Sequence, residues 1–158
     1  MTYFRWNSSF DLLDCINDLQ EPLVQTLSKV NTGVEFRLRD WDLIKLVVGV
    51  LKPFKDATEM LSHRDASISM AIPIVTTIMK GLETTAADQG VKTMKRDLQK
   101  SMEERFAGIE EIFDFSASTL LDAKFKKTLF RDPNAVERTK NFLLDKMVLM
   151  LQREVCAL

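Results

Sequence analysis

Apolar residues recur at spacings of three and four along most of this chain, which is the repeat of amphipathic helices. The clearest example begins after Asp40, a residue suited to cap a helix. Its apolar stripe consists of Leu43, Ile44, Val47, Val48, Leu51, Phe54, Thr58 and Leu61. Pro53 lies inside this stripe and leaves the carbonyl of Gly49 without its helical partner. Because the stripe continues in phase past Pro53, we expect one kinked helix and not two helices.

Other helices follow from the same repeat and from their end residues. Ser8 or Ser9 caps the first helix, whose apolar side includes Phe10 and Leu13. The remaining predicted helices run from Glu21 to Val30, from Ser67 or Ser69 to the break at 87–90, from Val91 to Phe113, and from Asp132-Pro133 to near the C-terminus.

Two of these helices have strongly apolar sides that we expect to face inward. In the helix after Ser67 these residues are Ile72, Val75, Ile78, Met79 and Leu82. In the last helix they are Val136, Phe142, Leu143, Met147, Met150 and Leu151. Both sets therefore belong to the predicted core.

The segment after Asp114 has a different composition. Residues 115–121 are uncharged and rich in small side chains, which predicts a buried connecting segment. Leu121, Phe125 and Leu129 then form a short helical stripe. In the preceding helix, Lys95 and the acidic pairs Glu103-Glu104 and Glu110-Glu111 are assigned to the solvated face, with other charged residues.

The chain is therefore predicted to be all-α. Its 158 residues contain only five glycines and four prolines, and no stretch alternates apolar and polar residues as a half-buried strand does. The expected architecture is a single irregular multi-helix domain of six to eight helices that covers residues 1–158.

The composition gives little support for catalysis. The net charge is −1, and the glycines never cluster as they do in phosphate-binding loops. Cys15, Cys156 and His63 are too few for a typical zinc site, and no local motif joins them into a nucleophilic pair. No apolar run approaches the ~20 residues of a membrane span. We predict no catalytic residue, no metal site, no cofactor and no membrane contact.

One basic segment stands out. Lys124, Lys126 and Lys127 occur together without an acidic residue, and Arg131, Arg138 and Lys140 follow. A basic surface beside Trp6 and Tyr3 would suit phosphate contacts and base stacking in nucleic-acid binding. The alternative is an ordinary solvated helix surface, and charge alone favours this alternative.

Three blocks, in order, resemble the hAT-superfamily transposases and the host proteins derived from them, such as BED zinc-finger proteins. The blocks are Arg5-Trp6-Asn7-Ser8-Ser9-Phe10-Asp11-Leu12-Leu13; Asp40-Trp41-Asp42-Leu43 through Val50-Leu51-Lys52-Pro53-Phe54-Lys55-Asp56-Ala57-Thr58, with Ser67-Ile68-Ser69 and Ile72-Pro73-Ile74 behind it; and Thr119-Leu120-Leu121-Asp122-Ala123-Lys124-Phe125-Lys126-Lys127. The chain departs from the family in two places. Phe10 replaces a commoner tyrosine, and Ala123-Lys124 replaces a Pro-Arg pair.

The resemblance implies a helical insertion domain without the two flanking halves of an RNase H-like core. In this family the metal-binding aspartates and glutamate belong to those halves, so the resemblance implies a fragment that is not an enzyme. It also implies a nuclear protein, with Trp6 near a DNA end and Arg5 at a phosphate. The alternative is that Trp6 packs against Phe10 and Leu13 as core.

Two functional hypotheses follow. The first is a non-catalytic scaffold that binds DNA ends through Arg5, Trp6, Lys124, Lys126 and Lys127. The second is a protein–protein interaction or homo-oligomerisation module without DNA binding.

Overall fold

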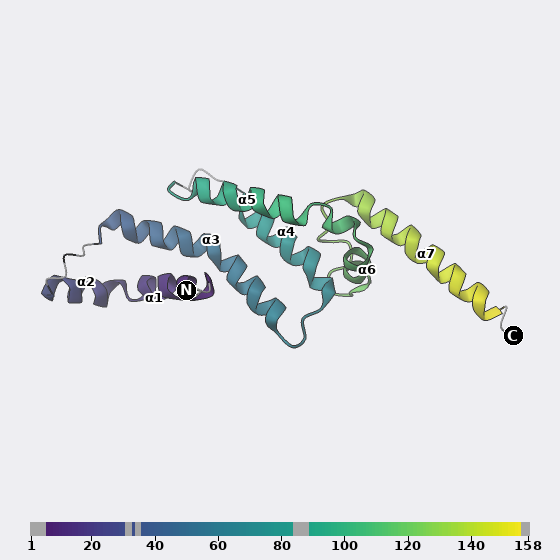
Figure 1. The fold of residues 1–158 in the computed structure, drawn as a ribbon, viewed down its shortest axis with the longest axis horizontal. Coiled ribbons are helices and arrows are strands. Elements are labelled where there is room, and N and C mark those ends of the chain that lie inside the picture. The colour runs from purple at the N-terminus through teal and green to yellow at the C-terminus, as the bar shows by residue number, and fades with distance from the viewer. Residues whose placement is uncertain (1–5, 31–32, 34–35, 84–88, 156–158) are drawn as a thin grey trace, which may run out of the picture. The chain divides into compact units, whose positions relative to one another are not determined.

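In the part of the chain that the structure describes, all regular secondary structure is helical (Figure 1). The computed structural model describes residues 6–30, 33, 36–83 and 89–155, with the backbone alone for 153–155. The described helices are α1 (Trp6–Asp18), α2 (Gln20–Lys29), α3 (Leu38–Ser62), α4 (Ala71–Gly81), α5 (Lys92–Phe106), α6 (Phe113–Leu121) and α7 (Pro133–Val155), with short 3-10 helices η1 (Ile68–Met70) and η2 (Ile109–Glu111). The predicted all-α fold of six to eight helices is confirmed.

The chain divides into two compact units. The first comprises Met1–Met60 and Gly81–Lys100, and the second comprises Leu61–Lys80 and Ser101–Leu158. The prediction of one domain over residues 1–158 stays a prediction.

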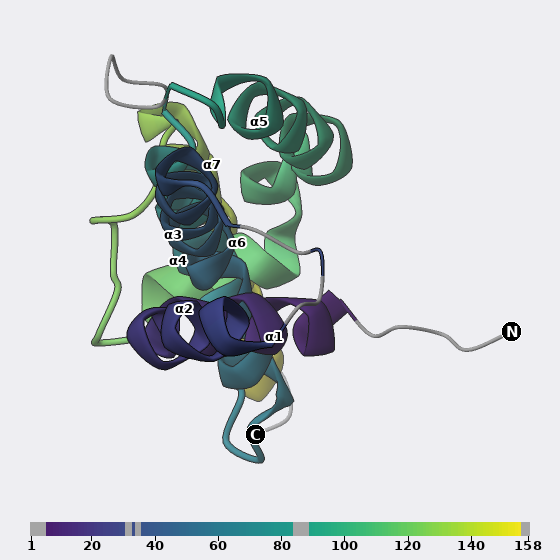
Figure 2. The same cartoon turned by 90° about the vertical axis from the view of Figure 1, so that its left-hand side faces the viewer.

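In the first unit, α3 returns alongside α1 after α2 (Figures 1 and 2). The Lys55 ammonium lies 3.0 Å from the Asp11 carboxylate and so joins the two helices. This hydrogen bond is the main reason that the pKa of Lys55 is raised. Phe10 is buried, as the apolar pattern predicts, but α1 begins at Trp6, two or three residues before the predicted caps.

Pro53 does not divide α3. The helix is continuous from Leu38 to Ser62 with the proline inside it, and its axis changes direction along its length (Figure 1). Trp41 is buried near its start, with its ring centroid 4.8 Å from that of Phe36. The prediction of a single helix through Pro53 is confirmed.

The helix predicted after Ser67 lies almost entirely in the second unit. The Ser67 hydroxyl accepts a hydrogen bond from the backbone N–H of Ser69 and caps η1, which leads directly into α4. The predicted inward residues of α4 that belong to this unit are all buried: Ile72, Val75, Ile78 and Met79. Leu82, in the first unit, is buried as well.

The long helix predicted from Val91 to Phe113 is wrong in its second part. It ends at Phe106, because Gly108 adopts a left-handed backbone with φ of 70°. After this break, the spacing of residues in the preceding helix no longer predicts which side chains are exposed. Glu110, expected on the solvated face, is buried. Lys95, also expected on the exposed face, is buried and donates to the Glu83 carbonyl at 2.7 Å.

The connecting segment predicted after Asp114 is instead a helix, α6, from Phe113 to Leu121. Its small residues Ser116, Ala117 and Thr119 are buried, because small side chains let a helix approach its neighbours closely. The short helical stripe predicted around Phe125 is wrong, since residues 123–129 form turns.

The last helix begins at Pro133, as predicted, and Val136 is buried. The other expected inward positions are not core. Phe142, Met147, Met150 and Leu151 are exposed, and Leu143 is half-buried. The helical repeat finds an apolar side correctly but does not show whether anything covers it.

We predict that Gly108→Ala lowers the free energy of unfolding by about 1 kcal/mol, because an L-residue is strained at positive φ. Crowding is not the cause, since an added Cβ would lie 3.5 Å from the nearest Glu111 oxygen. Gly49→Ala is the matched control, with open space around its Cβ inside α3, and should stabilise by up to about 1 kcal/mol. Urea unfolding followed by circular dichroism measures both, and equal stability of the two variants would contradict the assignment.

Candidate functional site

Trp6 is the first residue of α1, and it is 42% exposed. Phe10, one turn later, is 4% exposed, so the helix buries Phe10 while it leaves much of the indole accessible. Trp41, by contrast, is 3% exposed. Trp6 is therefore not simply core, although this exposure does not test its predicted contact with DNA. Arg5 and Tyr3 lie outside the described residues.

The three predicted lysines lie together in the turns that follow α6. Lys124, Lys126 and Lys127 are all exposed, and Lys126 has a left-handed backbone with φ of 51°. We call residues 122–132 the lysine loop. It belongs to the second unit, whereas Trp6 belongs to the first. A single surface formed by Trp6 and the lysines stays a prediction.

Asp122 fixes the start of the lysine loop. Its carboxylate accepts hydrogen bonds from the Ser69 hydroxyl at 2.7 Å and from the backbone N–H of Lys124 at 2.9 Å. The Thr119 hydroxyl donates to the Ser69 carbonyl at 3.0 Å, which ties α6 to η1 at the same place. The bond from Ser69, followed by that from Lys124, lowers the pKa of Asp122.

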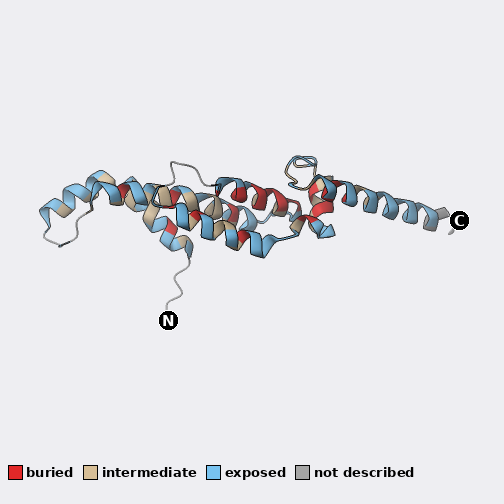
Figure 3. Cartoon of the chain, turned by 90° about the horizontal axis from the view of Figure 1, so that it is seen from above, coloured by how far each residue is buried: buried red, intermediate tan, exposed pale blue. Residues whose placement is uncertain are grey.

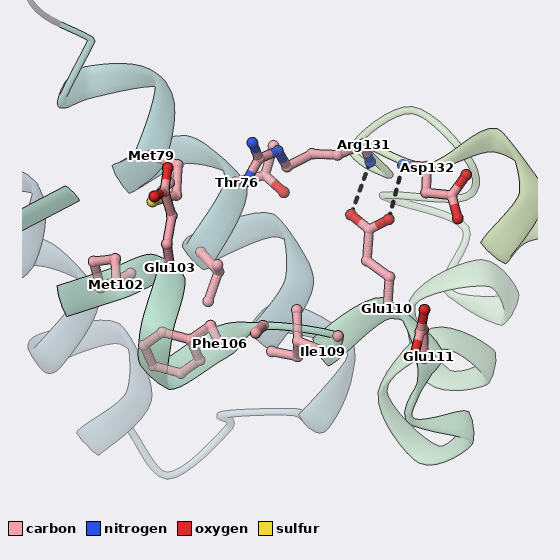
Figure 4. Close-up of a pocket in the computed structure, with 13 residues that line it drawn as sticks. Thr76, Met79, Met102, Glu103, Phe106, Ile109, Glu110, Glu111, Arg131 and Asp132 are labelled. Carbon is pink, nitrogen blue, oxygen red and sulfur yellow. Dashed lines mark hydrogen bonds between the residues drawn. The ribbon is translucent and has the colours of Figure 1, made fainter. Parts of the chain in front are cut away.

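Glu110 fixes the other end of the loop. Its two carboxylate oxygens accept the backbone N–H groups of Arg131 at 2.8 Å and Asp132 at 2.9 Å (Figure 4). Glu110 is only 9% exposed, so these bonds satisfy a buried carboxylate and two backbone donors together. Between the two ends, the Thr76 hydroxyl donates to the Leu129 carbonyl at 3.0 Å.

The loop leads directly into the cap of α7. The Asp132 carboxylate accepts the backbone N–H of Asn134 at 2.9 Å, and Pro133 occupies the first helical position. The bond from Asn134 is the main reason that the pKa of Asp132 is lowered. Glu110 therefore holds Asp132, the residue that caps the start of α7.

The lysines differ from two basic residues of α7, Arg138 and Lys140, in their ionic partners. Arg138 lies 3.1 Å from Asp132, and Lys140 lies 2.6 Å from Glu137. In the part of the chain that the structure describes, Lys124, Lys126 and Lys127 form no ion pair. All three side chains are exposed, although the charge of Lys124 also acts on the Asp122 carboxylate and contributes to its lowered pKa.

A pocket with a volume of about 270 Å³ lies beside the Glu110 clamp within the second unit (Figure 4). Met79, Met102, Phe106 and Ile109 give it an apolar lining, and Arg131 and Glu103 add charge. Among the described residues, no three His, Cys, Asp or Glu side chains are grouped to hold a metal ion. The described helices also include none long and apolar enough to cross a membrane.

The anchoring role of Glu110 was missed by the sequence analysis, which placed this residue on a solvated face. Gly108 is the feature that could have indicated it, because a helix often ends with a glycine at positive φ. Once the helix ends there, the position of Glu110 on the helical repeat no longer predicts exposure.

Comparisons with known proteins relate this chain to BED zinc-finger proteins. It is 26% identical over 147 residues to human zinc finger BED domain-containing protein 4, an alignment that covers 92% of this chain and 12% of that protein. It is 22% identical over 165 residues to human zinc finger BED domain-containing protein 6, covering 96% of this chain and 17% of that protein. The chain thus spans less than a fifth of the length of these relatives.

No family model matches the chain, and no solved structure gives a significant match. The comparisons therefore support a distant relationship to BED zinc-finger proteins. This agrees with the resemblance of the three sequence blocks to that group of proteins. The assignment to a hAT insertion domain stays a prediction.

We predict that Glu110→Gln lowers the free energy of unfolding of the second unit by about 2 kcal/mol, because the amide loses the charge and faces one backbone donor with its own N–H₂. Glu111→Gln is the matched control. Its carboxylate is exposed and lies 3.9 Å from Arg138, so the change should stay within about 0.5 kcal/mol. Urea unfolding measures both, and equal effects would refute the clamp.

Asp122 should make the stability of the second unit depend on pH. Its folded-state pKa lies below the ordinary value of 3.8, so its stabilising contribution is complete above that value and is lost as pH falls through the folded pKa. Ser69→Ala removes the largest cause, and we expect the carboxyl pKa of Asp122 to move up toward 3.8 in an NMR titration. An unchanged pKa in this variant would contradict the assignment.

Proposed function

We propose that this chain is the helical, non-catalytic part of a hAT-derived, BED-type nuclear protein and that it binds DNA through Arg5, Trp6, Lys124, Lys126 and Lys127. The similarity to a BED zinc-finger protein along 92% of the chain supports the assignment to a BED-type protein. The non-catalytic role rests on the resemblance, which assigns the metal-binding carboxylates to RNase H-like segments outside the matched blocks.

The lysine loop is the observation that carries the proposal. Three exposed lysines lie within four residues, and none of them is within ion-pair distance of a carboxylate in the part of the chain that the structure describes. Asp122 and Glu110 fix the backbone at both ends of the loop, so less conformational freedom is lost when the lysines meet a phosphate backbone.

Trp6 supplies the second kind of contact. An indole that is 42% exposed at the start of a helix has an accessible aromatic face. An unstacked base at a DNA end can stack on such a face, which typically contributes about 1–3 kcal/mol per base. Trp6 and the lysines would then provide stacking and phosphate binding, respectively.

A second candidate function is an association module without DNA binding. The exposed apolar residues in the second half of α7 favour it, because they offer a surface for another helix. This alternative would use residues other than Arg5, Trp6 and the three lysines.

We predict that Lys124, Lys126 and Lys127, changed together to Gln, weaken binding of a labelled DNA hairpin and reduce the slope of log K against log salt by up to about 3. The matched control changes Lys45, Lys80 and Lys92 to Gln, three exposed lysines outside residues 122–132 with the same loss of charge. Fluorescence anisotropy over a salt series measures both. No binding by the wild type, or equal weakening by the two triple variants, would reject the proposed site.

The same hairpin should quench the fluorescence of Trp6 and leave that of Trp41 unchanged, because Trp41 is 3% exposed. Trp6→Phe keeps an aromatic face and should retain most of the affinity, whereas Trp6→Ala should lose about tenfold or more. Equal affinities of these two variants would remove Trp6 from the site.

A further inference from the structure

The hydroxyl of Ser67 reaches the start of the lysine loop through a short chain of hydrogen bonds. The Ser67 and Ser69 hydroxyl oxygens lie 3.1 Å apart, and the Ser69 hydroxyl donates to the Asp122 carboxylate at 2.7 Å. The other Asp122 oxygen accepts the backbone N–H of Lys124 at 2.9 Å. All these residues belong to the second unit. A change at Ser67 can therefore act on the residue that fixes the loop.

The hydrogens of this chain run in one direction. A hydroxyl has one hydrogen and an ionised carboxylate has none, so the Ser69 hydrogen goes to Asp122. The hydrogen between the two serines then comes from Ser67. The Ser67 oxygen also accepts the backbone N–H of Ser69 at 3.4 Å. The Ser67 hydroxyl is thus the donor at the outer end of the chain.

Ser67 lies where an enzyme can reach it. Residues 61–68 are all exposed, and residues 63–67 are not helical. Ser67 itself has an extended backbone, with φ of −113° and ψ of 147°. Figure 3 shows the contrast with α4, whose residues are mostly buried and drawn in red. An exposed, irregular segment of this kind can enter the active site of a modifying enzyme while the neighbouring helices stay folded.

Arg64 gives this segment a charge pattern. It lies three residues before Ser67 and is exposed. In the part of the chain that the structure describes, its guanidinium forms no ion pair. Kinases select substrates by such charge patterns, and basophilic serine kinases bind an arginine at this spacing through carboxylates beside the active site.

We propose that Ser67 is a phosphorylation site for a basophilic serine kinase, and that a phosphate there releases the Asp122 anchor and weakens DNA binding by the lysine loop. In the reaction the Ser67 oxygen bonds to the γ-phosphorus of ATP, the bond from that phosphorus to the β-phosphate oxygen breaks, and ADP leaves. The hydroxyl proton passes to the catalytic aspartate of the kinase. The effect on DNA rests on the proposed function, whereas the effect on Asp122 does not.

The phosphate would reverse the role of Ser67 in the hydrogen-bond chain. At neutral pH it carries about −1.5 to −2 charges and offers three strong acceptor oxygens in place of a donor. It therefore competes with Asp122 for the single hydrogen of the Ser69 hydroxyl. Only that hydroxyl separates the two groups, so their negative charges also repel each other. The phosphate can still accept the backbone N–H of Ser69, and we expect α4 to stay folded.

The same charge acts on the lysines. Lys124 follows the Asp122 anchor by two residues, and its backbone N–H is held by that carboxylate. A phosphate at this end of the loop attracts the ammonium groups and repels the phosphates of DNA. Release of the anchor and the added negative charge therefore lower the affinity for DNA together.

The modification is tested by incubating the full chain with a basophilic serine kinase and ATP and by locating the phosphate by mass spectrometry. We expect phosphorylation of Ser67, and Arg64→Gln should slow it about tenfold or more. Arg105→Gln, which changes an exposed arginine elsewhere in the second unit, is the matched control and should react like the wild type. A chain that is not modified at Ser67, or an Arg64→Gln chain modified at the wild-type rate, overturns the proposal.

The effect on the anchor is measured without DNA. Phosphorylation of Ser67 should raise the carboxyl pKa of Asp122 and shift the backbone amide signal of Lys124 in NMR spectra, because the bond from Ser69 is lost and negative charge is added. Circular dichroism should show unchanged helicity. An unchanged pKa of Asp122 overturns the link between Ser67 and the loop, whatever the DNA measurement gives.

The effect on binding is measured with the labelled DNA hairpin. The phosphorylated chain should bind about tenfold or more weakly at low salt, and the difference should shrink as salt screens the charge. Ser67→Glu should weaken binding less, and Ser28→Glu is the matched control, since the Ser28 hydroxyl donates to the Gln25 carbonyl. Equal weakening by these two variants overturns the proposed switch. A wild type that does not bind the hairpin rejects the proposed function, and the mass and NMR measurements still decide the phosphorylation site.

Discussion

The second unit depends on two carboxylates that fix the ends of the lysine loop. Glu110 accepts the backbone N–H groups of Arg131 and Asp132, and Asp122 accepts from Ser69 and Lys124. Because Asp132 in turn caps α7, the Glu110 clamp sets both where the loop ends and where the last helix begins. The loop between these anchors is short and irregular, and without them its backbone donors would need water or other partners.

In the lysine loop, the residues that fix the backbone differ from the residues that are exposed to solvent. The carboxylates and the Thr119 and Thr76 hydroxyls are turned to the protein and satisfy buried or half-buried groups. The lysine ammonium groups are exposed and unpaired among the described residues. A surface of this kind suits an anionic polymer, since phosphate contacts need positive charge at a defined place and little shape complementarity.

The sequence predicts the helices well where local rules decide them. The periodic stripe gives α3 through Pro53, and the caps at Ser67 and Asp132 place the starts of η1 and α7. It fails where contacts distant in sequence decide. Glu110 is buried because it meets a loop more than twenty residues later, and α6 is helical although its small, uncharged residues resemble a connecting segment. The three lysines can be singled out from the local excess of positive charge in the sequence, whereas their anchors Asp122 and Glu110 are visible only in the fold.

Binding of DNA by the lysine loop is proposed from its exposed basic side chains and its fixed ends. Its most direct test is an NMR titration of the ¹⁵N-labelled chain with a DNA hairpin. We expect chemical-shift changes concentrated in the amides of residues 122–132 and in the Trp6 indole, with the signals of the buried Trp41 indole unchanged. Shift changes confined to other helices, or none at all, would contradict it.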